Sequence, residues 1–282
     1  MFWLLRIIVF LGLLLTFAGG ASTTFAQRIV SLGPINTENV YALGAGDRLV
    51  GNTNYCVRPE DAKTKAKIGS VLQISVERVI SLHPDLVLAT ALTRPEQIRQ
   101  LQDVGIEVVR FKRTASFAEI CAEFLRLGRL LGLEGEAEEI IARAESMVAE
   151  VRRKVAGSPT PKVFIQVGAM PLFGAVPNSF THDFIVLAGG INIIADQKTG
   201  TTSLEKVIGA NPEVIIIGIM GSESGIAAHE KRKWLQIPVI AAVENGRVHI
   251  INPDLICSPS PLTFARTLKL VAGMIHPDGF KD

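Results

Sequence analysis

Short runs rich in β-branched residues alternate with helical patterns along most of the chain. Several runs, such as VFIQV and EVIII, consist mostly of β-branched and other apolar residues, which is typical of strands. Glycine and proline mark many of the boundaries. The alternation predicts an α/β fold with central, mainly parallel sheets. The predicted strands are residues 28–33, 48–53, 85–90, 106–112, 162–168, 191–196, 213–219 and 247–252.

The alternation stops at residue 116, where a long helical pattern without a strand begins. Apolar residues recur in it at spacings of three and four, and Gly132 and Gly135 indicate a short break. The stretch AGSPTPK that follows has the composition of a linker. We therefore predict two similar lobes with an interposed helical segment. The expected divisions are a signal peptide (1–26), an N-terminal lobe (27–115), an interlobe helical segment (116–156) and a C-terminal lobe (157–282).

An internal repeat supports the two-lobed organisation. Residues 75–89 (SVERVISLHPDLVLA) and 203–217 (SLEKVIGANPEVIII) align without a gap, at a constant offset of 128 positions. Ser, Glu, Val, Ile and Pro coincide in register. A generic helix–proline–strand unit could produce part of this match, but the matching first turn, with Ser and Glu in register, makes a true repeat the better interpretation.

The two Ser-x-Glu turns of this repeat allow two interpretations. Ser75 and Ser203 suit the N-cap of a helix, and Glu77 and Glu205 then lie in a first turn, where the helix dipole favours a carboxylate. Capping explains each turn alone. Alternatively, equivalent turns on two lobes offer two exposed carboxylates that could orient the protein on a basic partner.

The first 26 residues indicate export. Arg6 precedes an apolar run that ends at Phe17, and small residues lead to a plausible cleavage point after Ala26. The run is too short for an ordinary membrane-spanning helix, although a retained N-terminal anchor stays an alternative. Because no cysteine lies near this point, we expect a free periplasmic protein that is not a lipoprotein.

Charge and cysteine content narrow the function further. The formal net charge is +2, and removal of Arg6 leaves about +1, so no basic surface suggests a nucleic-acid partner. Of the three cysteines, Cys121 fits a helical core position. Cys56 and Cys257 lie in predicted loops and could pair, line a binding site or do neither. We do not predict a disulfide, because it would restrain the lobes.

Other functional classes find little support in the sequence. The five histidines show no paired-ligand spacing, and no nucleophile elbow, phosphate-binding loop or Cys-x-x-Cys pair is present. We therefore expect no metal site, no cofactor and no catalytic residue. A zinc or manganese receptor and a cleft enzyme remain as alternatives, which metal titration and an assay for turnover would distinguish.

Motifs along nearly the whole mature chain resemble those of a known family. RIVSLGP with NTE, LGRLLGLEGEAEEII, SFTHDFIVLAGGINIIAD and both copies of the repeat are similar to the periplasmic binding proteins of cobalamin, haem and ferric-siderophore ABC importers. The resemblance implies two Rossmann-like lobes joined by a single long helix, with the ligand between them. It also implies a monomer that delivers a corrinoid or ferric chelate to a permease with its ATPase. Glu77 and Glu205 would contact arginines of that permease.

In α/β folds, ligands bind beyond the carboxyl ends of the strands, so loops at those ends supply the candidate ligand-binding residues. Aromatic side chains could form walls and arginines could meet anionic groups, although loop packing and simple solvation are rival interpretations. Tyr55 could also bind haem iron as a phenolate. The only tryptophan after the leader, Trp234, lies in a predicted C-lobe helix, which weakens the case for cobalamin. The candidates are Pro34, Asn36, Tyr55, Arg94, Arg113, Phe173, Phe180 and Ser258.

Overall fold

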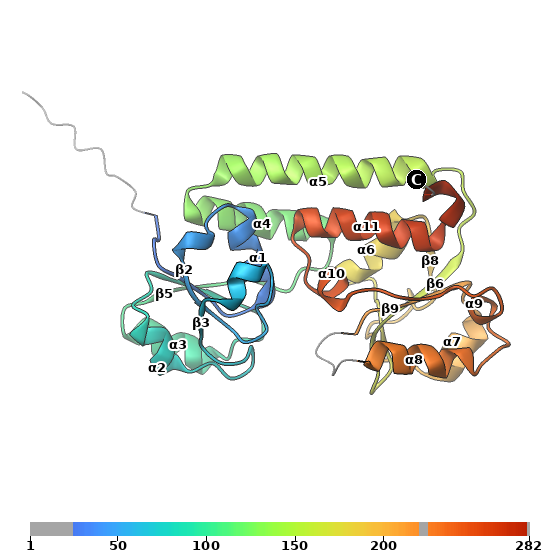
Figure 1. The fold of residues 1–282 in the computed structure, drawn as a ribbon, viewed down its shortest axis with the longest axis horizontal. Coiled ribbons are helices and arrows are strands. Elements are labelled where there is room, and N and C mark those ends of the chain that lie inside the picture. Colours follow the sequence, from blue (N-terminus) through green and yellow to red (C-terminus); the bar gives the residue numbers. More distant parts are fainter. Residues whose placement is uncertain (1–24, 220–224, 281–282) are drawn as a thin grey trace, which may run out of the picture.

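The computed structural model describes residues 25–219 and 225–280 and has two lobes, each built on a five-stranded sheet (Figure 1). The predicted α/β class with mainly parallel sheets is confirmed. None of the helices in the described ranges is long and apolar enough to cross a membrane. The predicted signal peptide falls almost entirely on residues 1–24, outside the described residues.

The N-lobe sheet is entirely parallel, with the strand order β3-β2-β1-β4-β5. Its central strands β1 and β4 are buried at every position. The strands are β1 (Ile29–Ser31), β2 (Leu49–Asn52), β3 (Ala66–Lys67), β4 (Leu86–Ala89) and β5 (Glu107–Arg110). The helices are α1 (Pro34–Ala42), α2 (Val76–Ser81) and α3 (Pro95–Asp103), with short 3-10 turns η1 (Gly46–Arg48) and η2 (Glu60–Lys63).

The C-lobe sheet has the order β10-β9-β6-β7, with β8 also paired to β6. Only β7 runs antiparallel to its neighbour. The strands are β6 (Lys162–Gly168), β7 (Phe173–Gly174), β8 (Ile191–Asn192), β9 (Val214–Ile217) and β10 (Val248–Ile250). The helices are α6 (Phe180–Leu187), α7 (Leu204–Ala210), α8 (Ile226–Leu235), α9 (Ala241–Glu244), α10 (Pro253–Cys257) and α11 (Pro261–Ile275), and the 3-10 turn η3 (Pro277–Phe280) follows.

Two antiparallel helices, α4 (Phe117–Leu131) and α5 (Glu134–Val155), run along one side of the molecule and extend over both lobes (Figure 1). At 1.5 Å per residue, α5 is about 33 Å long. Ser116 caps α4 through a bond from the Glu119 amide, and Gly132 ends it in the left-handed conformation with φ of 71°. The break predicted at Gly132 is therefore present.

Each of these helices contributes to the cores of both lobes. Phe124 of α4 and Ala137 of α5 pack into the N-lobe core, whereas Phe117 of α4 and Val148 of α5 pack into the C-lobe core. Phe264 of α11 stacks between Phe117, at a centroid distance of 4.7 Å, and Phe184 of α6, at 4.3 Å. The lobes are thus joined by a packed helical layer.

Some local boundaries differ from what the residue types suggest. Thr37 is a suitable N-cap residue but does not cap α1, because the helix already begins at Pro34 and the Thr37 hydroxyl donates to Ser31 Oγ instead. The helix that contains the RKWL stretch already begins at Ile226. The two-residue strands β3 and β7 were missed, since such short elements leave no hydrophobic period to detect.

Candidate functional site

The two Ser-x-Glu turns have the same local structure. Ser75 accepts a hydrogen bond from the Arg78 amide, and Ser203 accepts one from the Lys206 amide, each at 3.2 Å. The capping interpretation is therefore confirmed for both. Glu77 and Glu205 remain exposed, and no ion pair engages either carboxylate among the described residues.

Both carboxylates are held in their charged form. Each pKa lies below its ordinary value, first because the backbone amide of the same residue donates to the carboxylate, and then because the Ser75 or Ser203 hydroxyl does. Helices α2 and α7 lie on the side of the molecule away from α5 (Figure 1). Two unpaired negative charges, one per lobe, thus lie on the same side of the molecule.

A surface hollow of about 470 Å³ lies beside one of these turns. Leu204, the residue next to Glu205, forms part of its wall, with Leu172 and Ile237. The remaining lining residues come from α8, from the segment after it and from the segment after β6. The hollow belongs to the C-lobe alone, so it is not the site expected between the lobes.

Tyr55 lies on the loop that follows β2. Its side chain is 56% exposed. Lys67 holds this loop in place. Its ammonium donates to Asn52 Oδ1 at 2.7 Å, Ala62 O at 3.0 Å and Cys56 O at 3.3 Å. Burial lowers the pKa of Lys67. An exposed phenol on a braced loop is available to a ligand.

Arg94 and Arg113 follow β4 and β5, which are neighbours in the N-lobe sheet. Both are exposed, and neither side chain has a hydrogen-bond or ion-pair partner among residues 25–219 and 225–280. By contrast, Arg110 is bound to the carbonyls of Thr90 and Ala91. The two free guanidinium groups therefore give this sheet edge an unneutralised positive charge.

The C-lobe candidates are less exposed. Phe173 is partly buried, and its ring covers Gly200, where an added Cβ would lie 2.2 Å from the ring. Phe180 begins α6, packs against the C-lobe core and meets Phe184 edge-on. Ser258 is half-buried just after α10. The interpretation of Phe173 and Phe180 as packing residues gains support from these contacts.

Asn36 must be removed from the candidates. It is 2% exposed, and its amide donates to Leu88 O and Ala89 O, both at 3.2 Å. Its role is to hold α1 against the end of β4. Sequence alone placed it in a loop, because it could not show that the helix starts before it, at the partly buried Pro34.

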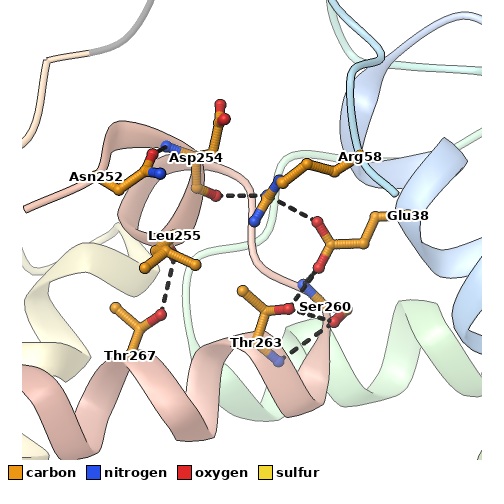
Figure 2. Close-up of polar contacts among 8 residues, drawn as sticks. All are labelled: Glu38, Arg58, Asn252, Asp254, Leu255, Ser260, Thr263 and Thr267. Atoms are coloured by element: carbon orange, nitrogen blue, oxygen red, sulfur yellow. Dashed lines mark hydrogen bonds and ion pairs between the residues drawn. The ribbon is translucent and has the colours of Figure 1, made fainter. Parts of the chain in front are cut away.

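A polar network joins the lobes at the carboxyl ends of the two sheets (Figure 2). Arg58, on the loop after β2, pairs with Glu38 of α1 at 2.7 Å and also donates to Asp254 O of α10 at 2.6 Å. Glu38 in turn accepts from the Thr263 hydroxyl at 2.5 Å and the Ser260 amide at 3.4 Å, both at the start of α11. Loops that carry Tyr55 and Ser258 therefore meet through this network.

The three cysteines are free. Cys56 lies beside Thr53 in the N-lobe, and Cys257 donates to Gly218 O in the C-lobe. Burial raises the pKa of the Cys257 thiol to about 12. Within residues 25–219 and 225–280, no three His, Cys, Asp or Glu side chains gather as metal ligands.

Comparison with known proteins agrees with the resemblance seen in the motifs. Residues 29–255 match the family of periplasmic binding proteins. The chain is 32% identical over 265 residues to the ABC transporter substrate-binding lipoprotein YvrC of Bacillus subtilis, covering 91% of this chain and 82% of the relative. It is 31% identical over 227 residues to the vitamin B12-binding protein of Yersinia pseudotuberculosis, covering 78% and 79%.

Solved structures give the same result. The periplasmic vitamin B12-binding protein BtuF of Vibrio cholerae is 26% identical, with a TM-score of 0.75 over 91% of this chain and 99% of that one. The periplasmic haem-binding protein RhuT of Roseiflexus sp. RS-1 is 25% identical, with a TM-score of 0.78 over 91% and 100%.

One expectation from the sequence is overturned by these relatives. The chain was expected not to be a lipoprotein, yet the Bacillus relative that matches 91% of it is one. The expectation rested only on the missing cysteine near Ala26, a feature of the leader. Because 91% of the chain matches a lipoprotein, the missing cysteine alone does not support an unlipidated protein.

Proposed function

The chain belongs to the periplasmic binding protein family, and we propose that it captures a corrinoid or a haem-type ferric chelate between its lobes for an ABC importer. Proteins of this family are the substrate-binding components of such importers and dock onto a permease with its ATPase. Relatives named for vitamin B12 and for haem support this ligand class. The single observation that carries the proposal is the match to both kinds of relative over most of the chain.

The chemistry of the candidate loops fits such a ligand. Tyr55 offers an exposed aromatic face and a phenol, and Arg94 and Arg113 offer two unpaired cations to carboxylate or amide oxygens. We further propose that Glu77 and Glu205 dock the loaded protein onto the permease, because both are exposed, charged and unpaired. Capture in this proposal involves no chemical change of the ligand, so measurable turnover would contradict it.

The direct test is titration of the purified mature protein with cyanocobalamin and with haemin, followed by absorption and calorimetry. We expect one of them to bind with a Kd of about 1 µM or tighter. If haemin binds through iron, Tyr55→Phe abolishes the phenolate band, whereas Tyr41→Phe, the matched control, leaves it intact. If neither cyanocobalamin nor haemin binds, the proposed ligand class is wrong.

A further inference from the structure

The contact between the lobes at the carboxyl ends of their sheets depends on one N-lobe carboxylate. The Glu38 side chain is only 13% exposed, and its two oxygens are divided between the lobes. Oε2 receives the Arg58 guanidinium, and Oε1 receives the hydroxyl of Thr263 and the amide of Ser260 (Figure 2). Oε2 is thus neutralised within the N-lobe, whereas Oε1 has its hydrogen-bond partners only when α11 of the C-lobe lies against α1.

Arg58 makes a second connection between the lobes. The same Nη2 atom that pairs with Glu38 donates to the carbonyl of Asp254, 196 residues later in the chain. The Arg58 side chain is 29% exposed, so the pair is better shielded than the exposed pairs on the helices, such as Arg99–Glu96 at 64% and 65%. Shielded, charge-assisted bonds hold their geometry more firmly than surface pairs do.

These residues lie between the loops on which the candidate ligand-binding residues are found. Arg58 is three residues from Tyr55, and Asp254 and Ser260 flank Ser258. The Arg58–Asp254 contact therefore links the N-lobe loop that carries Tyr55 to the C-lobe segment that carries Ser258. Since α1, α10 and α11 meet close to the helical layer (Figure 1), a small rotation at this contact becomes a larger displacement at the far ends of the lobes.

We propose that Glu38 and Arg58 form an interlobe clasp, in which Arg58 is a positioning residue that fixes the spacing between the Tyr55 loop and the Ser258 segment. The effect on ligand affinity rests on the proposed function. The clasp itself does not, because it is argued only from the contacts of Glu38 and Arg58 with α10 and α11. In this mechanism the clasp acts through the geometry of the walls and needs no contact between Arg58 and the ligand.

The variants that test the clasp are Arg58→Gln, Glu38→Gln and the double variant, with Arg99→Gln as a matched loss of one guanidinium from an exposed pair. The first readout is hydrogen exchange of the Ser260 amide in the ligand-free protein, because this amide donates to Glu38. Small-angle scattering reports the lobe arrangement. The second readout is the affinity, with on- and off-rates, for whichever of cyanocobalamin and haemin binds the wild type.

We expect Arg58→Gln to speed exchange at Ser260 and to weaken probe binding about tenfold, mainly through the off-rate, while Arg99→Gln changes neither. The double variant should lose less than the sum of the two single losses, because both remove the same contact. Arg58→Lys retains the charge and should recover part of the affinity. Should Arg58→Gln unfold the protein, Arg58→Lys and Glu38→Asp carry the same comparison.

Unchanged Ser260 exchange and unchanged scattering in Arg58→Gln would overturn the clasp, whatever the ligand. Additive losses in the double variant would also overturn it. Failure of both probes to bind the wild type would instead refute the proposed ligand class, and the ligand-free readouts would still decide the clasp.

Discussion

The two glutamates of the repeat lie in capped first turns, and we propose that they also dock the protein onto the permease. The pKa of each carboxyl lies below its ordinary value of 4.5, so the stability that its hydrogen bonds contribute is present above that value. That contribution is lost as the pH falls through the folded-state pKa. Down to that pH, Glu77 and Glu205 remain charged and able to meet cations of a permease.

Replacing both Glu77 and Glu205 with Ala is expected to weaken binding to the reconstituted permease by about tenfold or more for each residue. Ligand affinity should be unchanged, because neither residue lies on the candidate loops. Binding of the wild type should weaken with salt and persist at about pH 5, since the depressed pKa values keep both carboxylates ionised. Glu138→Ala with Glu139→Ala, on exposed α5 positions, is the charge-matched control; an equal loss there would refute specific docking.

The long helical segment shows how far a helix boundary can be predicted from sequence. Of the three glycines in residues 116–156, the sequence treated Gly132 and Gly135 alike, as marks of a break. The structure separates them. Gly132 ends α4 with φ of 71° and lies under the Phe25 ring, whereas Gly135 lies in the first turn of α5 with no atom within 4 Å of an added Cβ.

The two glycines should therefore respond oppositely to alanine. Gly132→Ala is expected to lower the free energy of unfolding by about 1 kcal/mol or more, because the left-handed cap is strained for a residue with a Cβ. Gly135→Ala is expected to raise it by about 0.5 kcal/mol, because alanine has the higher helix propensity. Urea denaturation of the two variants measures both, and equal effects would show that the cap geometry is unimportant.

At the scale of the whole molecule, the helical layer couples two separate sheets. Phe264 of α11 lies between Phe117 of α4 and Phe184 of α6, and α4 also reaches the N-lobe core through Phe124. Loss of packing among these three rings should lower the stability of both lobes. The lobes are therefore not expected to unfold independently.

Phe264→Ala is expected to destabilise the protein by about 3–5 kcal/mol, because the side chain is fully buried and its loss leaves a cavity. The buried Trp234 is the only tryptophan after the leader, so its fluorescence reports the C-lobe, whereas far-ultraviolet circular dichroism reports both lobes. The two urea transitions should coincide in the wild type and shift together in the variant. Separate transitions would refute the coupling.

The sequence by itself determined the features that depend on neighbours along the chain. The strands of the α/β alternation, the Ser75 and Ser203 caps and the break at Gly132 follow from hydrophobic period, capping chemistry and backbone conformation, all of which act over a few residues. The α/β class and the family resemblance followed from them.

Only the tertiary structure decided which side chains face one another. Asn36 turned inward to β4, Lys67 braced the Tyr55 loop, and Glu38 met Ser260 across 222 residues of sequence. Hydrophobic periodicity and residue spacing do not predict such side-chain contacts, because the contacts depend on how the chain packs in three dimensions and how the helical layer orients the two lobes. The polar connection between the lobes is therefore a property of the fold.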